Sequence, residues 1–135
     1  DAAGTALVIL DLDRFKVVND TYGHPVGDAA LAFVTRAIRA ATRPGDLVCR
    51  IGGDELAVLL PGCGAAAAVQ RAESMLAHVR DAPMDVTGTS VSLSLSAGVA
   101  HAPTHATDVE ALYAASDDAL YRAKRAGRDR VVVAL

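Results

Sequence analysis

A pair of glycines, Gly52 and Gly53, separates two short apolar runs, residues 46–51 (DLVCRI) and residues 55–60 (ELAVLL). Short runs with β-branched members are typical of strands, and a glycine pair between two of them is typical of a tight turn. The sequence therefore predicts a β-hairpin whose tip carries Asp54. Any fold for this chain has to contain that hairpin in a sheet.

Three other segments have the pattern of strands. Residues 6–13 (ALVILDLD) form a short apolar run that ends in the acids Asp11 and Asp13, which is typical of a buried strand. Residues 90–100 (SVSLSLSAGVA) alternate between polar and apolar residues, the period of a strand with one covered face. Residues 130–135 (RVVVAL) would close the chain as a last strand.

Two segments, residues 28–42 and residues 64–82, place apolar residues at helical spacing. A further helix is predicted after Thr107, because Thr107 and Glu110 have the spacing of a capping box, and it would end at Gly127. This order of strands and helices predicts an α+β fold with a split βαβ core.

The composition fits one domain that spans residues 1–135. A chain of 135 residues with 52% hydrophobic residues can bury a real core, and it is too short for two domains. A net charge of −3 and 4% aromatic residues offer neither a basic surface nor a stacking platform, so we expect no nucleic-acid polymer as a partner. No apolar run approaches the roughly 18 residues of a membrane span, so we expect no membrane segment here.

The two cysteines, Cys49 and Cys63, have no spacing that suggests a disulfide framework or a zinc site. Cys49 stands in an apolar run, so we expect a small buried residue. This usage favours a reducing cytoplasm. Because the chain starts at Asp1 without methionine, we expect it to be a fragment of a longer protein.

Asp11 and Asp54 would lie close together if the first strand pairs with the hairpin. Neighbouring carboxylates repel each other unless a cation lies between them. Oxygen ligands with open positions suit Mg²⁺ or Mn²⁺, especially where phosphate oxygens complete the octahedron. The implied chemistry is metal-assisted phosphoryl or nucleotidyl transfer. The structural alternative is that both acids are ordinary turn and strand-end residues.

The polar stretch after the first strand carries groups that could bind guanine. The carboxylate of Asp28 can accept from the ring N–H and the exocyclic amine, and the amide of Asn19 can donate and accept. Adenine has no matching donor pair, so such a site would reject ATP. Alternatively, Asp28 is a helix N-cap, and Asn19 and Gly23 are turn residues. Lys16 and His24 could contact a ligand or be solvated.

Basic residues occur at two further places. Lys124 and Arg128 flank the expected end of the last helix, where they could stabilise the helix dipole or hold the terminal phosphates of a nucleotide. Arg43 and Asp46 stand in a loop, RPGD, that could be a plain connection. Their side chains could instead pair with a phosphate and a guanine edge.

Four blocks of sequence, taken together, carry a resemblance to a known family. They are residues 11–28 (DLDRFKVVNDTYGHPVGD), 43–56 (RPGDLVCRIGGDEL), 94–100 (SLSAGVA) and 117–131 (DDALYRAKRAGRDRV). They resemble the GGDEF-domain diguanylate cyclases, whose signature reads Gly52-Gly53-Asp54-Glu55-Leu56 here. The resemblance spans nearly the whole chain.

The resemblance implies a ferredoxin-like, palm-type fold with a central antiparallel sheet flanked by helices, in the order β-α-α-β-β-α-β-α-β. It also implies that two GTP-loaded domains meet as a homodimer and form cyclic di-GMP, releasing two pyrophosphates. The monomer would then be inactive, and an upstream sensor domain would control dimerisation. The alternative is a catalytically silent module that binds GTP or cyclic di-GMP.

The resemblance also assigns roles to residues. Two Mg²⁺ or Mn²⁺ ions would be held by Asp11, the Leu12 carbonyl and Asp54, and Asp54 would take the proton from the attacking hydroxyl. The other implied site residues are Glu55 (support of the metal site), Lys16 (charge in the transition state), Asn19, Asp28 and nearby His24 (guanine), Gly52 and Gly53 (substrate), and Lys124 and Arg128 (phosphates).

Arg43 and Asp46 match the family's RxxD site, where bound product inhibits the enzyme. Three departures from the family pattern stand out. Leu56 replaces a phenylalanine at an expected core position, and Ser74 stands where many members have an arginine that assists product binding, so inhibition would be weak. The chain also begins after the place where members carry a DxLTGLxNRR segment.

Overall fold

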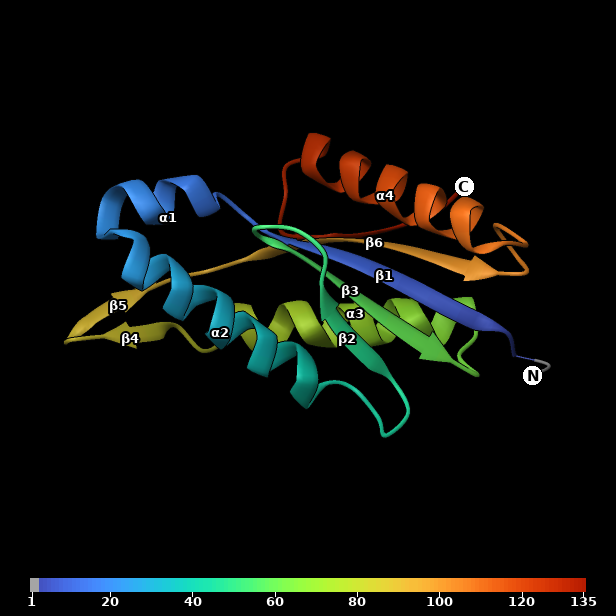
Figure 1. Cartoon of the computed structure of the whole chain (residues 1–135), viewed down its shortest axis with the longest axis horizontal. Coiled ribbons are helices and arrows are strands. Elements are labelled where there is room, and N and C mark those ends of the chain that lie inside the picture. The colour runs from blue at the N-terminus through green and yellow to red at the C-terminus, as the bar shows by residue number, and fades with distance from the viewer. Residues whose placement is uncertain (1–2) are drawn as a thin grey trace.

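The computed structural model describes residues 3–135 as one α+β unit (Figure 1). Along the chain the elements are β1 (Thr5–Leu12), α1 (Phe15–Tyr22), α2 (His24–Ala40), β2 (Leu47–Arg50), β3 (Glu55–Pro61), α3 (Ala65–Arg80), β4 (Met84–Val86), β5 (Thr89–Val91), β6 (Leu95–Ala102), α4 (Val109–Arg125) and β7 (Val131–Val133). No helix within residues 3–135 is long and apolar enough to cross a bilayer.

Five strands form the main sheet in the order β2-β3-β1-β6-β7, with β1 at its centre. The β1–β3, β1–β6 and β2–β3 pairs are antiparallel, whereas β7 is parallel to β6. The sheet is therefore mixed, and the expectation of an antiparallel sheet throughout needs this correction. The cause is α4, which carries the chain back along the sheet after β6, so that β7 runs in the same direction as β6.

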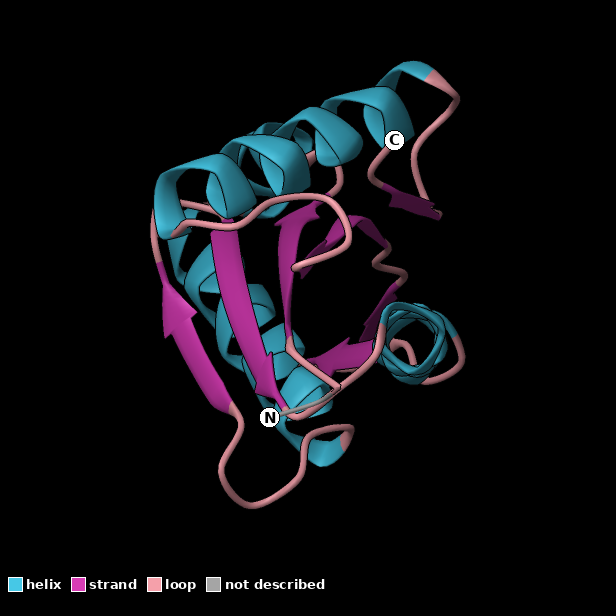
Figure 2. Ribbon diagram, turned by 90° about the vertical axis from the view of Figure 1, so that its right-hand side faces the viewer, coloured by secondary structure: helices cyan, strands magenta, loops and turns pink. Residues whose placement is uncertain are grey.

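Helices cover both faces of the sheet (Figure 2). Helix α4 packs on β6 and β1, while α2 and α3 lie on the opposite face. Successive side chains of β1 point to opposite faces. Leu10 and Leu12 therefore join the core under α2 and α3, whereas Leu7 packs with Leu112 of α4. Asp11 shares the α4 side with Leu7.

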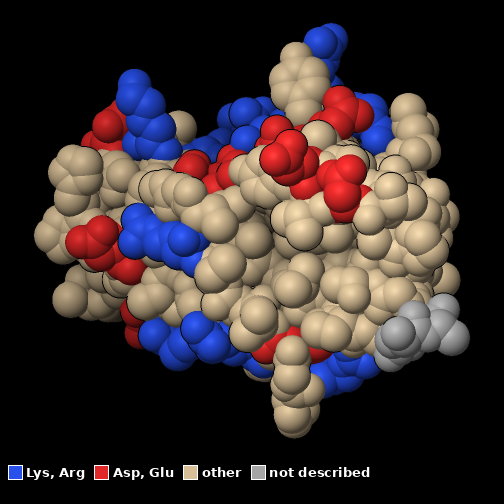
Figure 3. Space-filling model, turned by 45° about the vertical axis from the view of Figure 1, so that its right-hand side comes forward, with Lys and Arg blue, Asp and Glu red and all other residues tan. Residues whose placement is uncertain are grey.

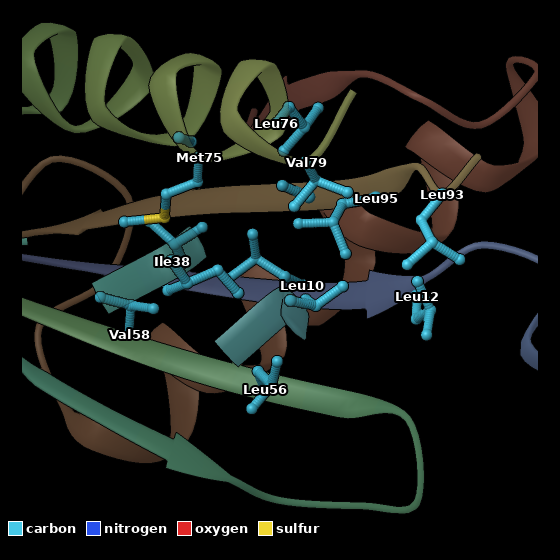
Figure 4. Close-up of a cluster of buried hydrophobic side chains, with 14 of the residues drawn as sticks. Leu10, Leu12, Ile38, Leu56, Val58, Met75, Leu76, Val79, Leu93 and Leu95 are labelled. Carbon is cyan, nitrogen blue, oxygen red and sulfur yellow. The ribbon is translucent and has the colours of Figure 1, made fainter. Parts of the chain in front are cut away.

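The larger core lies between the sheet and helices α2 and α3. Figure 4 shows Leu10, Ile38, Leu56, Met75 and Val79 within it, and each is 0–3% exposed. Full burial of a side chain of this size stabilises the fold by about 1.5–3 kcal/mol. Leu56 thus occupies a core position, as expected for the residue that replaces phenylalanine in the signature.

The polar stretch after β1 forms a short helix, α1, and the start of α2. Gly23 separates them with a φ of 94°, a left-handed conformation that glycine adopts without strain. Helix α2 begins at His24 with Pro25 in its first turn, earlier than the expected start at residue 28. Asp28 lies inside α2, so its alternative interpretation as an N-cap is wrong.

The N-cap of α4 is Asp108, and the expected capping box at Thr107 and Glu110 is wrong by one residue. The Asp108 carboxylate accepts a hydrogen bond from the Ala111 N–H at 2.8 Å. A carboxylate is as good a cap as a hydroxyl, and its charge also suits the positive end of the helix. At the other end, Gly127 follows the C-cap residue with a φ of 125°, close to the expected end of the helix.

The serine-rich segment predicted as one strand is divided between two sheets. Its first residues form β5, which pairs with β4 in a separate hairpin, and its later residues form β6. The β4–β5 turn has positive φ at both Thr87 (45°) and Gly88 (82°). This conformation is typical of a two-residue hairpin turn. The expected order of elements therefore lacked β4 and β5.

Cys49 is exposed, so the expectation of a buried cysteine is wrong. On β2 it points to the same side of the sheet as α4, but α4 packs mainly over β6, β1 and β7. The uncovered area is an apolar groove of about 520 Å³, whose lining includes Leu47, Cys49, Leu59 and Val109.

Candidate active site

The two predicted acids meet where β1 and β3 lie side by side. Asp11 stands opposite Glu55 in the β1–β3 ladder, and the Leu12 N–H donates to the Asp54 carbonyl oxygen at 3.1 Å. The hairpin turn therefore places Asp54 beside the end of β1. This juxtaposition was expected on the condition that the first strand pairs with the hairpin, and the β1–β3 ladder meets that condition.

Asp11 is a buried carboxylate with one oxygen in use and one free. Its side chain is 10% exposed, and its Oδ2 accepts a hydrogen bond from Nζ of Lys124. Its Oδ1 is buried without a hydrogen-bond partner. Burial is the largest cause that raises the pKa of Asp11, to about 6, and the neighbouring Asp54 adds to it while Lys124 acts in the opposite direction. The site thus holds unfavourable negative charge that a cation would relieve.

The residues present fit a hard divalent cation. The available donors are the Asp11 and Asp54 carboxylates and the main-chain carbonyl of Leu12, all of them oxygen. Within the described part of the chain no three His, Cys, Asp or Glu side chains converge. Mg²⁺ usually binds in this way, through one or two carboxylates with water and substrate phosphate in its remaining positions.

Asp13, the other acid at the end of β1, has a different environment. Its two carboxylate oxygens accept hydrogen bonds from the hydroxyls of Ser94 (2.7 Å) and Ser96 (2.6 Å). Asp13 therefore does not offer a free oxygen to the cleft as Asp11 does.

A cleft of about 220 Å³ opens over these acids, and basic residues surround it. Its lining is Asp11, Leu12, Asp13, Arg14, Phe15, Lys16, Asp54, Lys124 and Arg128. The side chain of Lys16 is 91% exposed and lies 4.0 Å from Asp20, so it is free to move toward a ligand. The structure thus brings together Lys16, Lys124 and Arg128, which come from distant parts of the sequence.

Glu55 lies on the α4 side of the sheet. Burial raises its pKa, and the nearby carboxylate of Asp117 adds to this effect. Lys124 and Tyr113, both from α4, favour the charged form instead. Most of the groups that act on the Glu55 carboxylate therefore belong to α4, and Asp54 of the hairpin adds to the rise in its pKa.

The hairpin tip is held by a residue that the sequence interpretation did not assign. Arg50 donates from Nε to the Gly52 carbonyl at 3.0 Å and from Nη2 to the Gly53 carbonyl at 2.7 Å. Both glycines are exposed, and a Cβ at Gly53 would meet no atom within 4 Å. Nothing in the fold itself crowds this position, so the open space is available to a ligand.

The predicted guanine residues lie where α1 meets α2. Asn19 packs so closely on Gly27 that a Cβ added to Gly27 would lie 1.7 Å from Asn19 Oδ1. This Oδ1 is buried and has no hydrogen-bond partner. Asp28 follows Gly27 and is exposed, and His24 lies in the preceding turn of α2. Gly27 is thus required for the close approach of the two helices.

Arg43 and Asp46 form a pair away from the cleft. Arg43 donates to Asp46 from its backbone N–H at 2.7 Å and from Nη2 at 3.1 Å. Burial alone would raise the pKa of Asp46, but the hydrogen bonds from Arg43 hold it below its ordinary value. Asp46 is also 3.6 Å from Nη2 of Arg71, an α3 residue that the sequence interpretation missed. Arg71 lies one turn before Ser74 on α3.

On the face drawn in Figure 3, acidic and basic side chains lie beside one another along the upper and lower edges and at the left, and a broad uncharged area lies between these charged groups. That face carries no continuous basic patch. The basic residues that matter for a phosphate ligand are instead those that line the cleft over Asp11.

Residues 2–130 match the family described as "Diguanylate cyclase, GGDEF domain". The chain belongs to this family. This chain is 39% identical to the diguanylate cyclase DgcP of Pseudomonas aeruginosa over 134 residues, which are 99% of this chain and 20% of DgcP. The curated relatives are longer proteins, of which this domain spans 20–35% in the first three cases.

Solved structures agree with this assignment. The GGDEF domain of TpbB from Pseudomonas aeruginosa matches with a TM-score of 0.93 and 41% identity, covering 97% of this chain and 82% of that one. The GGDEF domain of DgcB from Caulobacter crescentus, solved in complex with c-di-GMP, matches with a TM-score of 0.87 and 30% identity, covering 96% and 77%. The expected α+β fold is thereby confirmed.

Proposed function

We propose that this GGDEF domain is a diguanylate cyclase that condenses two GTP into cyclic di-GMP. The observation that carries the proposal is the free, buried Oδ1 of Asp11 beside Asp54, in a cleft lined by Lys16, Lys124 and Arg128. Acids that bind a metal and basic residues that bind phosphate are the two requirements of nucleotidyl transfer.

Asp11, the Leu12 carbonyl and Asp54 would hold Mg²⁺ or Mn²⁺, two ions per site. When bound, the ions polarise the α-phosphate and lower the pKa of the attacking 3′-hydroxyl. Asp54 would accept the proton of that hydroxyl, and Glu55 would support the metal site. Each attack forms one 3′-oxygen–phosphorus bond and breaks the bond between the α-phosphorus and the bridging oxygen, so two attacks release two pyrophosphates.

The basic residues would act on the triphosphate. Lys124 and Arg128 would hold its phosphates, and the exposed side chain of Lys16 would stabilise charge in the transition state. Lys124 already contacts Asp11, so it lies at the edge of the metal site.

The base would be bound between α1 and α2. Asn19 and Asp28 would pair with the guanine edge, with His24 nearby. The exposed glycines Gly52 and Gly53 would let the backbone approach the nucleotide. The free Oδ1 of Asn19 supports this assignment, because a buried acceptor without a partner costs about 1–3 kcal/mol until something donates to it.

Each domain would bring one GTP, so catalysis would need a homodimer, controlled by an upstream sensor domain in the longer protein. We place this reaction in the cytoplasm, where GTP is available. The pair Arg43 and Asp46 would bind cyclic di-GMP and inhibit the enzyme. That the related DgcB domain was solved with c-di-GMP supports a product-binding role for the family fold.

The test is product analysis by mass spectrometry after incubation of GTP and Mg²⁺ with this domain fused to a dimerising coiled coil. We expect cyclic di-GMP from the parent and none from Asp54→Ala. The alternative function is a silent module that binds GTP or cyclic di-GMP. Nucleotide binding without product from the forced dimer, also with a DxLTGLxNRR segment placed before residue 1, would favour that alternative.

A further inference from the structure

Asp13 joins three parts of the chain by hydrogen bonds. The residue is buried, with 8% of its surface exposed. Oδ1 accepts from the Ser96 hydroxyl at 2.6 Å, and Oδ2 accepts from the Ser94 hydroxyl at 2.7 Å and from the Asp129 N–H at 3.1 Å. Asp13 follows β1, the two serines lie at the start of β6, and Asp129 lies in the loop after α4.

The loop after α4 has an unfavourable backbone that needs such support. Arg128 and Asp129 are consecutive non-glycine residues with φ of 66° and 50°. A left-handed conformation is unfavourable for a residue with a Cβ and persists only where its surroundings hold it. The Asp129 N–H also donates to Ser96 Oγ at 3.2 Å, and Ser96 itself donates to Asp13, so Asp13 holds this amide both directly and through Ser96. The Asp129 carboxylate in addition forms a salt bridge with Arg80 of α3 at 2.9 Å.

This loop positions a residue of the cleft. Arg128 lines the same cleft as Asp11, and Asp11 stands two positions before Asp13 on the chain. A single carboxylate thus links the strand that carries the proposed metal ligand to the loop that carries a proposed phosphate ligand. Resting on the function proposed for the cleft, we infer that Asp13 is a positioning residue that fixes Arg128 over the cleft and is not a metal ligand.

The hydrogen bonds distinguish these two roles. Both oxygens of Asp13 are already occupied by three donors, whereas Oδ1 of Asp11 has none. An asparagine could keep this arrangement, because its oxygen can accept from Ser94 and Asp129 while its amino group donates to Ser96. A metal site loses an anionic ligand on the same change. Asp13→Asn is therefore the variant that separates positioning from metal binding.

The first test is amide hydrogen exchange of the domain without nucleotide or metal. We expect Asp13→Ala to make the Asp129 amide exchange about tenfold faster or more, while Asp13→Asn stays within about threefold of the parent. Asp85→Asn, an exposed acid on β4, controls for loss of charge, and the Met75 amide reports on global stability. If Asp13→Ala does not fold, Asp13→Ser is used instead. The serine side chain is shorter than that of aspartate, so its hydroxyl should not reach the Asp129 N–H. Unchanged Asp129 exchange in the alanine or serine variant would overturn the inference.

The second test uses the forced dimer and a double-mutant cycle. We expect Asp13→Ala to lower kcat/KM about tenfold in the parent but less than about threefold in the Arg128→Ala background, because its effect passes through Arg128. Additive losses, or an Asp13→Asn variant as inactive as Asp11→Asn, would contradict a positioning role. If no variant, including the parent, makes product, the proposed function fails while the exchange result still decides whether Asp13 holds the loop.

Discussion

Lys124, in the last turn of α4, donates a hydrogen bond to Asp11 at the end of β1, across 113 positions of the sequence. The pair joins the helix that covers one face of the sheet to the sheet's central strand. The positive charge of Lys124 also compensates part of the negative charge of Asp11 and Asp54. Burial, together with the remaining negative charge, raises the pKa of Asp11, so the stability of the domain should depend on pH.

We predict that Asp11→Asn stabilises the metal-free domain at neutral pH. The folded chain holds the Asp11 proton up to a pKa of about 6, whereas the unfolded chain releases it near 3.8. The free energy of unfolding of the parent should therefore fall as pH rises from 4 to 6 and stay level above, and the variant should lack this fall. Allowing for the lost partner of Lys124, we expect a gain of about 1–3 kcal/mol at pH 7.

Urea unfolding at pH 4 and pH 7 measures this difference, with Asp20→Asn on the exposed side of α1 as the control. A variant that is less stable than the parent at pH 7 would show that the contact with Lys124 outweighs the burial of the charge. The same variant should not bind Mg²⁺ with GTP.

We predict that Leu56→Ala lowers the free energy of unfolding by about 2–4 kcal/mol, because the side chain is 3% exposed in the larger core. Leu47→Ala on the adjacent strand is the matched control. Its side chain is 62% exposed, so the loss should stay below about 1 kcal/mol. Equal losses in thermal or urea unfolding would mean that the hairpin does not pack as described.

The N-cap of α4 gives a prediction that separates two neighbouring residues. Asp108→Ala should cost about 1 kcal/mol, because the Ala111 N–H loses its acceptor, whereas Thr107→Ala should stay within about 0.5 kcal/mol. Urea unfolding of the two variants in parallel measures this. The reverse order would restore the capping box that the sequence spacing suggested.

Product inhibition, if this domain is an active cyclase, should depend on Arg71. We predict that Arg71→Ala raises the inhibition constant of cyclic di-GMP about 3- to 10-fold, because Arg71 approaches Asp46 and supplies a cation where Ser74 has none. Arg71→Lys should fall between, and Arg36→Ala on the exposed side of α2 should have no effect. If Arg43→Ala raises the inhibition constant and Arg71→Ala leaves it unchanged, the inhibitory site consists of Arg43 and Asp46 without Arg71.

The sequence predicted those features that depend on short-range patterns. The hairpin followed from two apolar runs around Gly52 and Gly53, and the meeting of Asp11 with Asp54 was expected if the first strand pairs with that hairpin, as it does. The order implied by the family resemblance includes helix α1, but the residue pattern did not locate it. Its start at Arg14 is left-handed and has no side-chain cap, so nothing local marks it. The turn at Thr87 and Gly88, by contrast, was a usable signal for the β4–β5 hairpin.

The remaining differences depend on contacts between distant segments. The hydrogen bonds of Asp13 come from Ser94, which lies 81 positions further along the chain, and from Ser96, which lies 83 positions further. No spacing rule predicts contacts over such separations. Cys49 is exposed because α4 packs mainly over β6, β1 and β7, which depends on how the helix packs rather than on the apolar run around the cysteine. Arg71 reaches Asp46 only once α3 lies beside the loop that follows α2.

Both edges of the main sheet are short, four residues in β2 and three in β7. A short edge strand offers few free backbone groups to a strand from another chain. Two such domains therefore have little means to merge their sheets into one continuous structure. The homodimer proposed above would then be held by side-chain contacts, and it could form and separate without any strand leaving its place.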